Sequence, residues 1–366
     1  MYLLLSTHLL LSAIGIEWFY KGVEEFGYIT IRSLIVRIVC LIALFAFVRN
    51  KDDLYIYASI HVLSEVGNYV FNFVHLRKHV TLKEVPWKKM NLKRHLKPSL
   101  RIFVLNLITS IYVNLDSVML GFLSTTVAVG FYSSVTRLTK VLLGIVTTLG
   151  TVLLPRLSNY ISSGETAAFN SVSGKASRFV ITLATPMVIG LIFCAPQLIM
   201  VMCGSEFIPA ITTIRIIAPI ILFIGLSNLV GLQVLYSQGQ EKIVIISTLC
   251  GAIVNFLLNY ILIPYFAQNG AAIATVMAEF CVTSVMLVVG RKFIPFSVIN
   301  KYSFRILLFS IVICAPIPFV QHLSFPDVAL FMLEVVIATF LYVILLALSH
   351  NEFLMIIKET IKNKKK

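Results

Sequence analysis

The stretch VNLDSVMLGFLSTTVAVGFYSSVTRLTK, from Val113 to Lys140, combines long apolar runs with one aspartate and two cations. Asp116 lies within the first apolar run, and Arg137 and Lys140 lie within the second. Moving an ionised side chain to the middle of a bilayer costs roughly 2.5–3.5 kcal/mol on insertion scales. Such residues therefore face the interior of a helical bundle or a wet cavity. The stretch predicts two membrane helices inside a larger bundle.

The composition of the whole chain also indicates a membrane protein. Of its 366 residues, 58% are hydrophobic and only 13% are charged, whereas soluble domains are roughly 45–50% apolar and about 25% charged. A membrane β-barrel would alternate apolar and polar residues along strands of about 10 residues, and that alternation is missing from the sequence. We therefore expect an all-α fold, a polytopic transmembrane helical bundle.

Apolar runs recur along the chain, and we expect about eleven spans, since a helix needs about 20 residues to cross the hydrocarbon. The runs cover residues 2–16, 29–48, 54–75, 98–123, 127–154, 176–201, 210–236, 243–263, 270–290, 302–320 and 328–348. Run 127–154 is long enough to require a tilted helix or an interfacial end.

The distribution of positive charge predicts the orientation of these spans. In a soluble chain a net charge of +14 would suggest a nucleic-acid partner. Here most of the 30 lysines and arginines lie in alternate loops, and the loops on the other side hold only Arg49 and Lys51. The positive-inside rule then predicts a cytoplasmic carboxyl end and no nucleic-acid partner. The same rule places Met1 outside, and an odd number of spans before Met1 would restore a cytoplasmic amino end.

No motif for catalysis or metal binding is found in the sequence. Walker, G-x-S-x-G and H-E-x-x-H motifs are missing, the seven histidines are scattered, and the six cysteines lie in apolar stretches without a C-x-x-C pair. We therefore expect a protein that is not an enzyme and that has no cofactor and no metal site.

Charged residues at membrane depth are the candidates for function. Arg137 and Lys140 are three positions apart and share one helix face. The tight turn before them makes the two helices antiparallel neighbours, so Asp116 can reach the Arg137 side. An ion pair between Asp116 and Arg137 can simply hold the helices together, or Asp116 can orient Arg137 within an anion site. Lys140 favours the anion site, because one carboxylate does not neutralise two cations.

Other spans contribute further candidates. Arg37 lies well inside span 29–48, whereas Arg32 lies near its inner end, where a long side chain can reach the interface. Glu279 follows the small-residue run NGAAIATVMAE and can either exchange protons for energy coupling or bond to a neighbour. Two amide pairs, each spaced one helical turn apart, are expected to join helices: Asn68 with Asn72, and Asn255 with Asn259.

Several segments together resemble the Wzx-type oligosaccharide flippases of the multidrug/oligosaccharidyl-lipid/polysaccharide exporter superfamily. They are EWFYKGVEEFGYITIRS (Glu17–Ser33), NLDSVMLGF and VGFYSSVTRL (Asn114–Leu138), VLLPRLSNY (Val152–Tyr160), SQGQEK (Ser237–Lys242) and NGAAIATVMAE (Asn269–Glu279). The similarity covers essentially the whole chain. It implies a two-lobed, MATE-like fold in which run 2–16 is the fourth span, so that three spans are missing before Met1.

The resemblance also implies a division of the chain. We expect residues 1–75 to form an incomplete first transmembrane lobe, 76–97 a basic cytoplasmic loop between lobes, 98–290 a second six-helix lobe, 302–348 an extra helix pair and 349–366 a basic cytoplasmic tail.

The function implied by the resemblance is the transfer of polyprenyl-diphosphate-linked oligosaccharide units across the bacterial inner membrane by alternating access. A diphosphate needs cations to replace its lost water. Depth and charge assign that role to Arg37, Arg137 and Lys140, with Asp116 orienting Arg137 and Glu279 as the coupling residue. The expected partners are the lipid-linked oligosaccharide, membrane lipid and other polysaccharide assembly proteins.

Three alternatives stay open. A multidrug exporter of the same superfamily would favour carboxylates and aromatic residues for cationic drugs. A polysaccharide polymerase of the membrane would need a sizeable outer loop with catalytic residues, and the expected outer loops are short. An inactive truncated fragment would follow from the missing spans.

Overall fold

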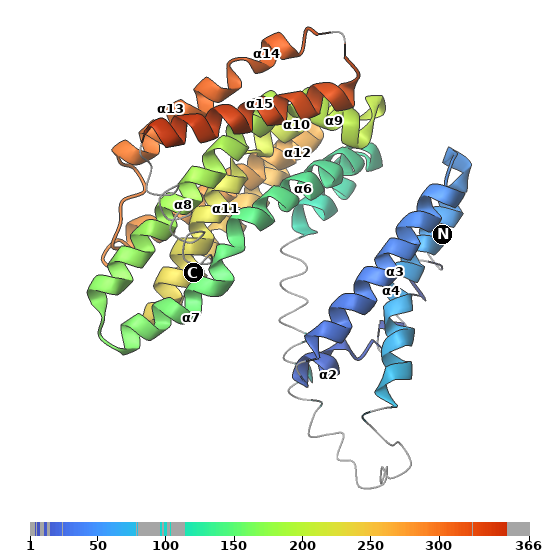
Figure 1. The fold of residues 1–366 in the computed structure, drawn as a ribbon, viewed down its shortest axis with the longest axis horizontal. Coiled ribbons are helices and arrows are strands. Elements are labelled where there is room, and N and C mark those ends of the chain that lie inside the picture. The colour runs from blue at the N-terminus through green and yellow to red at the C-terminus, as the bar shows by residue number, and fades with distance from the viewer. Residues whose placement is uncertain are drawn as a thin grey trace, which may run out of the picture. The chain divides into compact units, whose positions relative to one another are not determined.

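The computed structural model describes residues 15–23, 25–77, 114–323 and 325–349, together with isolated positions in 4–12 and 79–103. Helices joined by short turns make up these residues, and no β-strand occurs among them (Figure 1). The predicted all-α fold is therefore confirmed. The chain divides into two compact units, Met1–Ser99 and Leu100–Lys366. Most of the expected basic loop 76–97 and the tail 349–366 lies outside the described residues, so the assignment of lobes stays a prediction.

The first unit is built on a helical hairpin. Helix α2 (Glu17–Gly22) leads into α3 (Phe26–Phe47), and α4 (Leu54–Leu76) packs against α3. Both long helices match expected spans, whereas run 2–16 lies mostly outside the described residues. The hairpin buries few apolar side chains, chiefly Val36, Cys40 and Ile60. Most of its large apolar residues point outward, as lipid-facing helices require.

A short 3-10 helix, η1 (Lys51–Asp53), closes the turn of this hairpin. The Asp53 carboxylate accepts hydrogen bonds from the backbone N–H groups of Arg49 and Asn50, both at 2.9 Å. Together with the Asn50 side chain these bonds form a capping box, which satisfies backbone donors that a helix start leaves free.

The second unit contains the stretch Val113–Lys140, described from Asn114 onward. Helix Asn114–Leu123 and helix α6 (Thr126–Thr147) are joined by a tight turn. Thr125 caps α6, because its hydroxyl oxygen accepts a hydrogen bond from the Ala128 N–H at 3.2 Å. The expected span 127–154 is divided, since α6 ends at Thr147 and α7 (Leu149–Ser162) follows. Pro155 in α7 lacks an N–H and weakens the helical turn next to this break.

The rest of the second unit forms a bundle in which α13 packs along α8, and α15 packs against α13 and α9 (Figure 1). Its elements are α8 (Thr166–Phe193), α9 (Ala195–Cys203), η4 (Ser205–Phe207), α10 (Ala210–Ile217), α11 (Ile220–Asn228), the π-helical η5 (Leu229–Leu235), η6 (Tyr236–Gln238), α12 (Glu241–Val289), α13 (Lys301–Cys314), α14 (Ile317–Val320) and α15 (Asp327–Leu348).

Helix α12 is a hairpin of two helices joined at Ala267, whose backbone leaves the helical region with φ 47° and ψ −126°. Its two halves correspond to the expected spans 243–263 and 270–290. A Cβ on Gly270 would lie 2.5 Å from the Leu262 carbonyl oxygen, so only glycine permits this close return. The small residues after Gly270 are buried, which confirms the closely packed helix predicted from NGAAIATVMAE.

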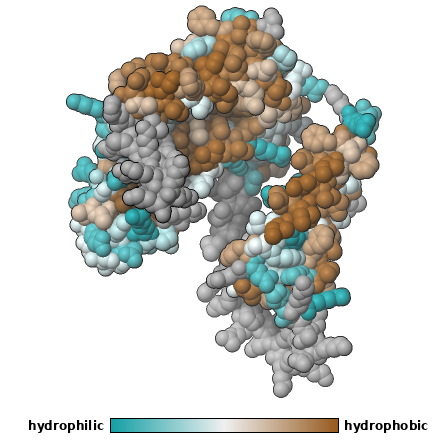
Figure 2. All heavy atoms as spheres, viewed as in Figure 1, coloured by the Kyte–Doolittle hydropathy of each residue, from teal (hydrophilic) through white to brown (hydrophobic). Residues whose placement is uncertain are grey.

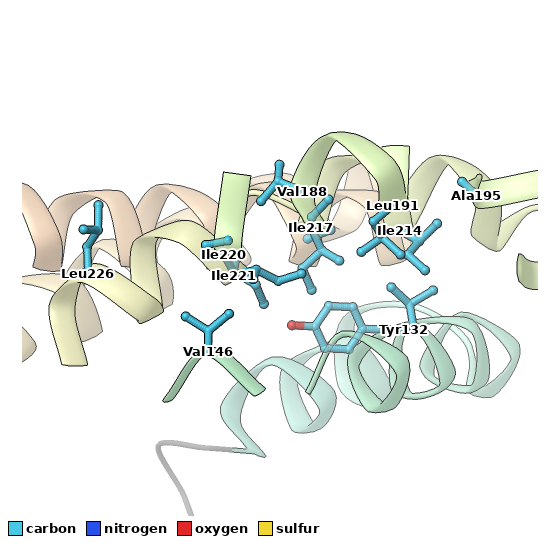
Figure 3. Close-up of a cluster of buried hydrophobic side chains, with 14 of the residues drawn as sticks. Tyr132, Val146, Val188, Leu191, Ala195, Ile214, Ile217, Ile220, Ile221 and Leu226 are labelled. Atoms are coloured by element: carbon cyan, nitrogen blue, oxygen red, sulfur yellow. The ribbon is translucent and has the colours of Figure 1, made fainter. Parts of the chain in front are cut away.

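The core of the second unit is aliphatic. Tyr132 of α6 lies beside Ile214 and Ile217 of α10 and Ile221 of α11, and all four are 3% exposed or less (Figure 3). Side chains of this size, packed together, supply the van der Waals contacts that hold helices together where lipid surrounds them.

The protein is a multi-pass membrane protein. Within the described residues, 7 helices are long and apolar enough to cross a membrane. Large apolar side chains cover much of the surface of α3 and of the second unit, as Figure 2 shows in brown. The expected number of about eleven spans stays a prediction, because runs 2–16 and 98–123 are only partly described.

Candidate functional site

Asp116 accepts four hydrogen bonds from neutral side chains in the second unit. Its Oδ1 accepts from the Nδ2 atoms of Asn255, at 2.9 Å, and Asn259, at 2.6 Å. Its Oδ2 accepts from the hydroxyls of Tyr132, at 2.7 Å, and Thr275, at 2.9 Å. These five residues, named here the Asp116 cluster, join helix Asn114–Leu123, α6 and both halves of α12.

Local helical geometry positions each donor of the Asp116 cluster. Asn255 and Asn259 are one turn apart on the face of α12 that also carries Gly251, and a Cβ on Gly251 would overlap Val282 of the returning half. This close contact between the halves brings Thr275 to the same carboxylate. Asn259 is fully buried, and its Oδ1 has no hydrogen-bond partner among the described residues.

The expected ion pair between Asp116 and Arg137 is replaced by this cluster. An α-helix advances about 100° per residue, so Arg137 lies about 140° around α6 from Tyr132. Tyr132 is buried against Asp116, whereas Arg137 is exposed. Neutral donors therefore occupy both oxygens of the carboxylate, and no ion pair of Asp116 with Arg137 forms in the described part of the chain. Asp116 does not orient Arg137 directly.

Arg137 and Lys140 share the exposed face of α6, opposite its buried face. Arg137 lies near the middle of this apolar helix, where a side chain has the longest path to water at either membrane surface. Two cations at this depth require a wet or anionic environment outside the second unit's own core.

In the first unit, Arg32 is buried whereas Arg37 is exposed. The Arg32 side chain is 6% exposed and donates hydrogen bonds to Asn72 Oδ1 and, at 3.1 Å, to Ser33 Oγ. Asn72 in turn donates from Nδ2 to the Gly15 carbonyl at 2.6 Å. The expectation that Arg32 extends to the interface is thus wrong, because residue 32 faces α4. Its role is to join helices.

Arg37 is exposed and lines a cavity of about 220 Å³ between α3 and α4. Apolar side chains form most of its wall, and His61, Ser64 and Tyr57 contribute polar groups. The cavity and the cation suit a ligand that is partly apolar and negatively charged.

Comparison with known proteins connects this architecture to exporters of polysaccharide units. The family model described as polysaccharide biosynthesis protein matches residues 1–161, and the model described as MatE matches residues 102–261. The chain is 24% identical over 280 residues to an Escherichia coli K12 protein named "Putative O-antigen transporter", which covers 75% of this chain. A Shigella dysenteriae protein of the same name is 22% identical over 289 residues, covering 78% of this chain and 71% of that protein. These matches support the resemblance of the chain to Wzx-type, MATE-like exporters.

The fold of the chain is also similar to a solved structure. The lipid II flippase MurJ, in an inward closed conformation, matches with a TM-score of 0.73 at 15% sequence identity. The match covers 95% of this chain and 72% of the MurJ chain. The aligned region spans 66% of the Escherichia coli relative's length.

Glu279 lies one turn beyond Thr275 on α12 and is half-buried. Its carboxylate forms no hydrogen bond with another described side chain. Its spacing from Thr275 places it next to the Asp116 cluster, so two carboxylates share this side of the α12 hairpin. The assignment of Glu279 to energy coupling stays a prediction.

Sequence reasoning missed most of the Asp116 cluster. Asn255 and Asn259 were expected only to join helices, and Tyr132 and Thr275 were not singled out. The sequence feature that could have indicated the cluster is the one-turn spacing of the two asparagines, which gives an otherwise apolar helix one polar face.

A polar cavity of about 380 Å³ was also missed. It lies between the first half of α8 and residues 295–300, and its lining includes Lys175, Arg178, Ser177 and Asn300. Two cations beside hydroxyl and amide groups form an environment suited to an anionic group.

Proposed function

We propose that this chain moves polyprenyl-diphosphate-linked oligosaccharide units from the inner to the outer leaflet of the bacterial inner membrane for surface polysaccharide or O-antigen biosynthesis. The observation that carries the proposal is the pair of cations, Arg137 and Lys140, on the exposed face of the apolar helix α6. The names of the Escherichia coli and Shigella relatives, O-antigen transporters, support the substrate class.

The chemistry of the substrate explains why cations stand inside apolar helices. A diphosphate carries about two negative charges and loses its hydration when it enters the protein, so it needs charge-assisted hydrogen bonds in return. Each bond of this kind contributes about 1.5–3 kcal/mol. Arg137 offers a planar fork of donors and Lys140 a compact ammonium, while Arg37 adds a third cation from the first unit.

The translocation cycle needs an energy source, and the Asp116 cluster is the site that suits a coupling ion. A carboxylate surrounded by amide and hydroxyl groups binds either a proton or a small monovalent cation, because amide and hydroxyl oxygens are ligands for hard cations. The unpartnered Asn259 Oδ1 supplies one such oxygen within the cluster. Glu279, next to the cluster, is the second carboxylate through which charge can move.

Orientation and chemistry complete the proposal. The basic loops and the carboxyl end lie in the cytoplasm, and the lipid tail of the substrate stays in the membrane while the sugar crosses through the protein. Translocation breaks no covalent bond, so the chain acts as a transporter and not as an enzyme. Other polysaccharide assembly proteins receive the unit on the outer side.

The proposal is tested by replacing both α6 cations, Arg137→Gln with Lys140→Gln. The purified chain in lipid nanodiscs is titrated with a polyprenyl diphosphate, and surface polysaccharide is measured in cells that depend on this chain for export. We expect binding to weaken at least about 100-fold, because two charge-assisted contacts are lost. Lys242→Gln, which removes a cation in the first turn of α12, is the matched control. Unchanged binding and export at equal protein levels would overturn the proposal.

A further inference from the structure

Three metal-ligating side chains meet at one end of the first unit. The Nε2 atom of His79 lies 3.3 Å from Glu25 Oε1, and the Nε2 atom of His75 lies 3.8 Å from Glu25 Oε2. One ligand atom from each of the three residues lies within 4.8 Å of the other two. Glu25 comes from the turn between α2 and α3, His75 from the last turn of α4, and His79 from the turn after it.

The two distances distinguish a shared ion from a direct hydrogen bond. A charge-assisted N–H···O bond between imidazolium and carboxylate is about 2.7–2.9 Å long, and both contacts are longer. Zinc binds imidazole nitrogen and carboxylate oxygen at about 2.0–2.2 Å, so two ligands of one tetrahedral ion lie about 3.3–3.6 Å apart. The contacts of His79 and His75 with Glu25 are closer to this spacing than to that of a direct bond.

The surroundings of the three residues suit a half-buried site. The side chains of His75, His79 and Glu25 are 23%, 28% and 34% exposed. The Glu25 Oε2 atom is buried and has no hydrogen-bond partner among the described residues. The Tyr28 ring stacks on His75, with ring centroids 4.1 Å apart, and holds that imidazole in place.

We propose that Glu25, His75 and His79 bind a divalent transition-metal ion, with zinc as the ion that fits the ligand set. Two imidazoles and one carboxylate form a three-ligand zinc site, and a fourth position is left for water. The proposal departs from the expectation of no metal site, which came from the sequence, where a whole hairpin separates Glu25 from the histidines. The sequence feature that could have indicated this site is the four-residue spacing of His75 and His79.

A bound ion would connect the α2–α3 turn to the end of α4 and so close the hairpin of the first unit. An ion that binds only the folded form shifts the unfolding equilibrium toward that form. The proposed role is therefore to hold the two ends of this hairpin together, independently of substrate binding.

The test uses the full chain without a polyhistidine tag, stripped of metal and reconstituted in nanodiscs. Zinc is titrated by calorimetry, and Co²⁺ is added separately to read its visible absorption. We expect one zinc ion per chain, the strong absorption bands of four-coordinate Co²⁺, and a rise in the unfolding temperature. His79→Ala and Glu25→Gln should each weaken zinc binding at least tenfold, and His322→Ala, an exposed histidine of the second unit, should leave it unchanged.

Two results would overturn the proposal. One is wild-type zinc affinity equal to that of the His75→Ala/His79→Ala double variant. The other is weak Co²⁺ absorption like that of the hydrated ion. Size-exclusion profiles of all variants serve as the check on folding, which separates a loss of binding from a loss of structure.

Discussion

Each unit holds a charged side chain among neutral hydrogen-bond partners, but the charges have opposite signs, and Arg32 is buried whereas Asp116 is half-buried. In the first unit the Arg32 guanidinium is held by the oxygens of Asn72 and Ser33. In the second unit the Asp116 carboxylate is held by amide N–H and hydroxyl groups. Both use neutral partners, and neither uses an ion pair among the described residues.

The two sites differ in whether the charged group can bind and release a proton or an ion. Arginine keeps its proton under all ordinary conditions, so the Arg32 site has one state and serves packing. A carboxylate can bind a proton or a cation, and the proposed coupling role of Asp116 rests on this chemistry. Each unit also carries cations on an exposed helix face: Arg37 on α3, and Arg137 with Lys140 on α6. Under the proposed function, Arg32 has a structural role, Asp116 binds the coupling ion, and the exposed cations bind the substrate.

The largest expected effect is on the Asp116 cluster. Asp116→Asn keeps the size of the side chain but removes the charge that binds a proton or cation. We expect transport to fall by about 100-fold with little change in unfolding temperature, since losing a buried charge partner costs about 2–5 kcal/mol of binding. Export assayed at several pH values and Na⁺ concentrations identifies the ion. Transport at the wild-type rate would mean that Asp116 is structural, like Arg32.

The next effect concerns the stability of the first unit. Asn72→Leu removes the acceptor of Arg32 and leaves a buried guanidinium without its main partner. We expect a loss of roughly 3 kcal/mol in the free energy of unfolding, measured by thermal or denaturant unfolding in detergent. Asn68→Leu is the matched control, because among the described residues Asn68 Nδ2 bonds only to the Ser64 carbonyl of its own helix. Equal losses in the two variants would show that Arg32 does not depend on Asn72.

The smallest effect lies in the exposed turn of the first hairpin. Hydrogen bonds from the Arg49 and Asn50 backbone N–H groups lower the pKa of Asp53 below its usual value. A depressed pKa in the folded state stabilises the fold at neutral pH, and this stabilisation disappears as pH falls through that pKa. Unfolding of the wild type and of Asp53→Asn, followed from pH 7 to acid, should therefore converge at low pH. A constant difference across pH would rule out this ionisation as the cause.

Particular residues show how far the sequence could predict the site. The charge of Arg137 and Lys140 at membrane depth, and their common face, follow from helical periodicity alone. The hydrogen-bond partners of Asp116 cannot be predicted in this way, because donors such as Asn259 and Thr275 lie far along the chain. Sequence spacing suggested the nearest cation as partner, and the packing of α12 supplied neutral donors instead.

The sequence by itself determined the all-α class, the membrane location and most span positions. These depend on hydropathy and helix length, which are local properties of the chain. Tertiary structure alone decided which charges are buried. Whether Arg32 or Arg37 faces α4, and whether Asp116 meets Tyr132 or Arg137, depends on how helices rotate and fold back against each other. The return of α12 at Gly270 brings distant residues to one carboxylate, because only close packing of small side chains lets the two halves meet there.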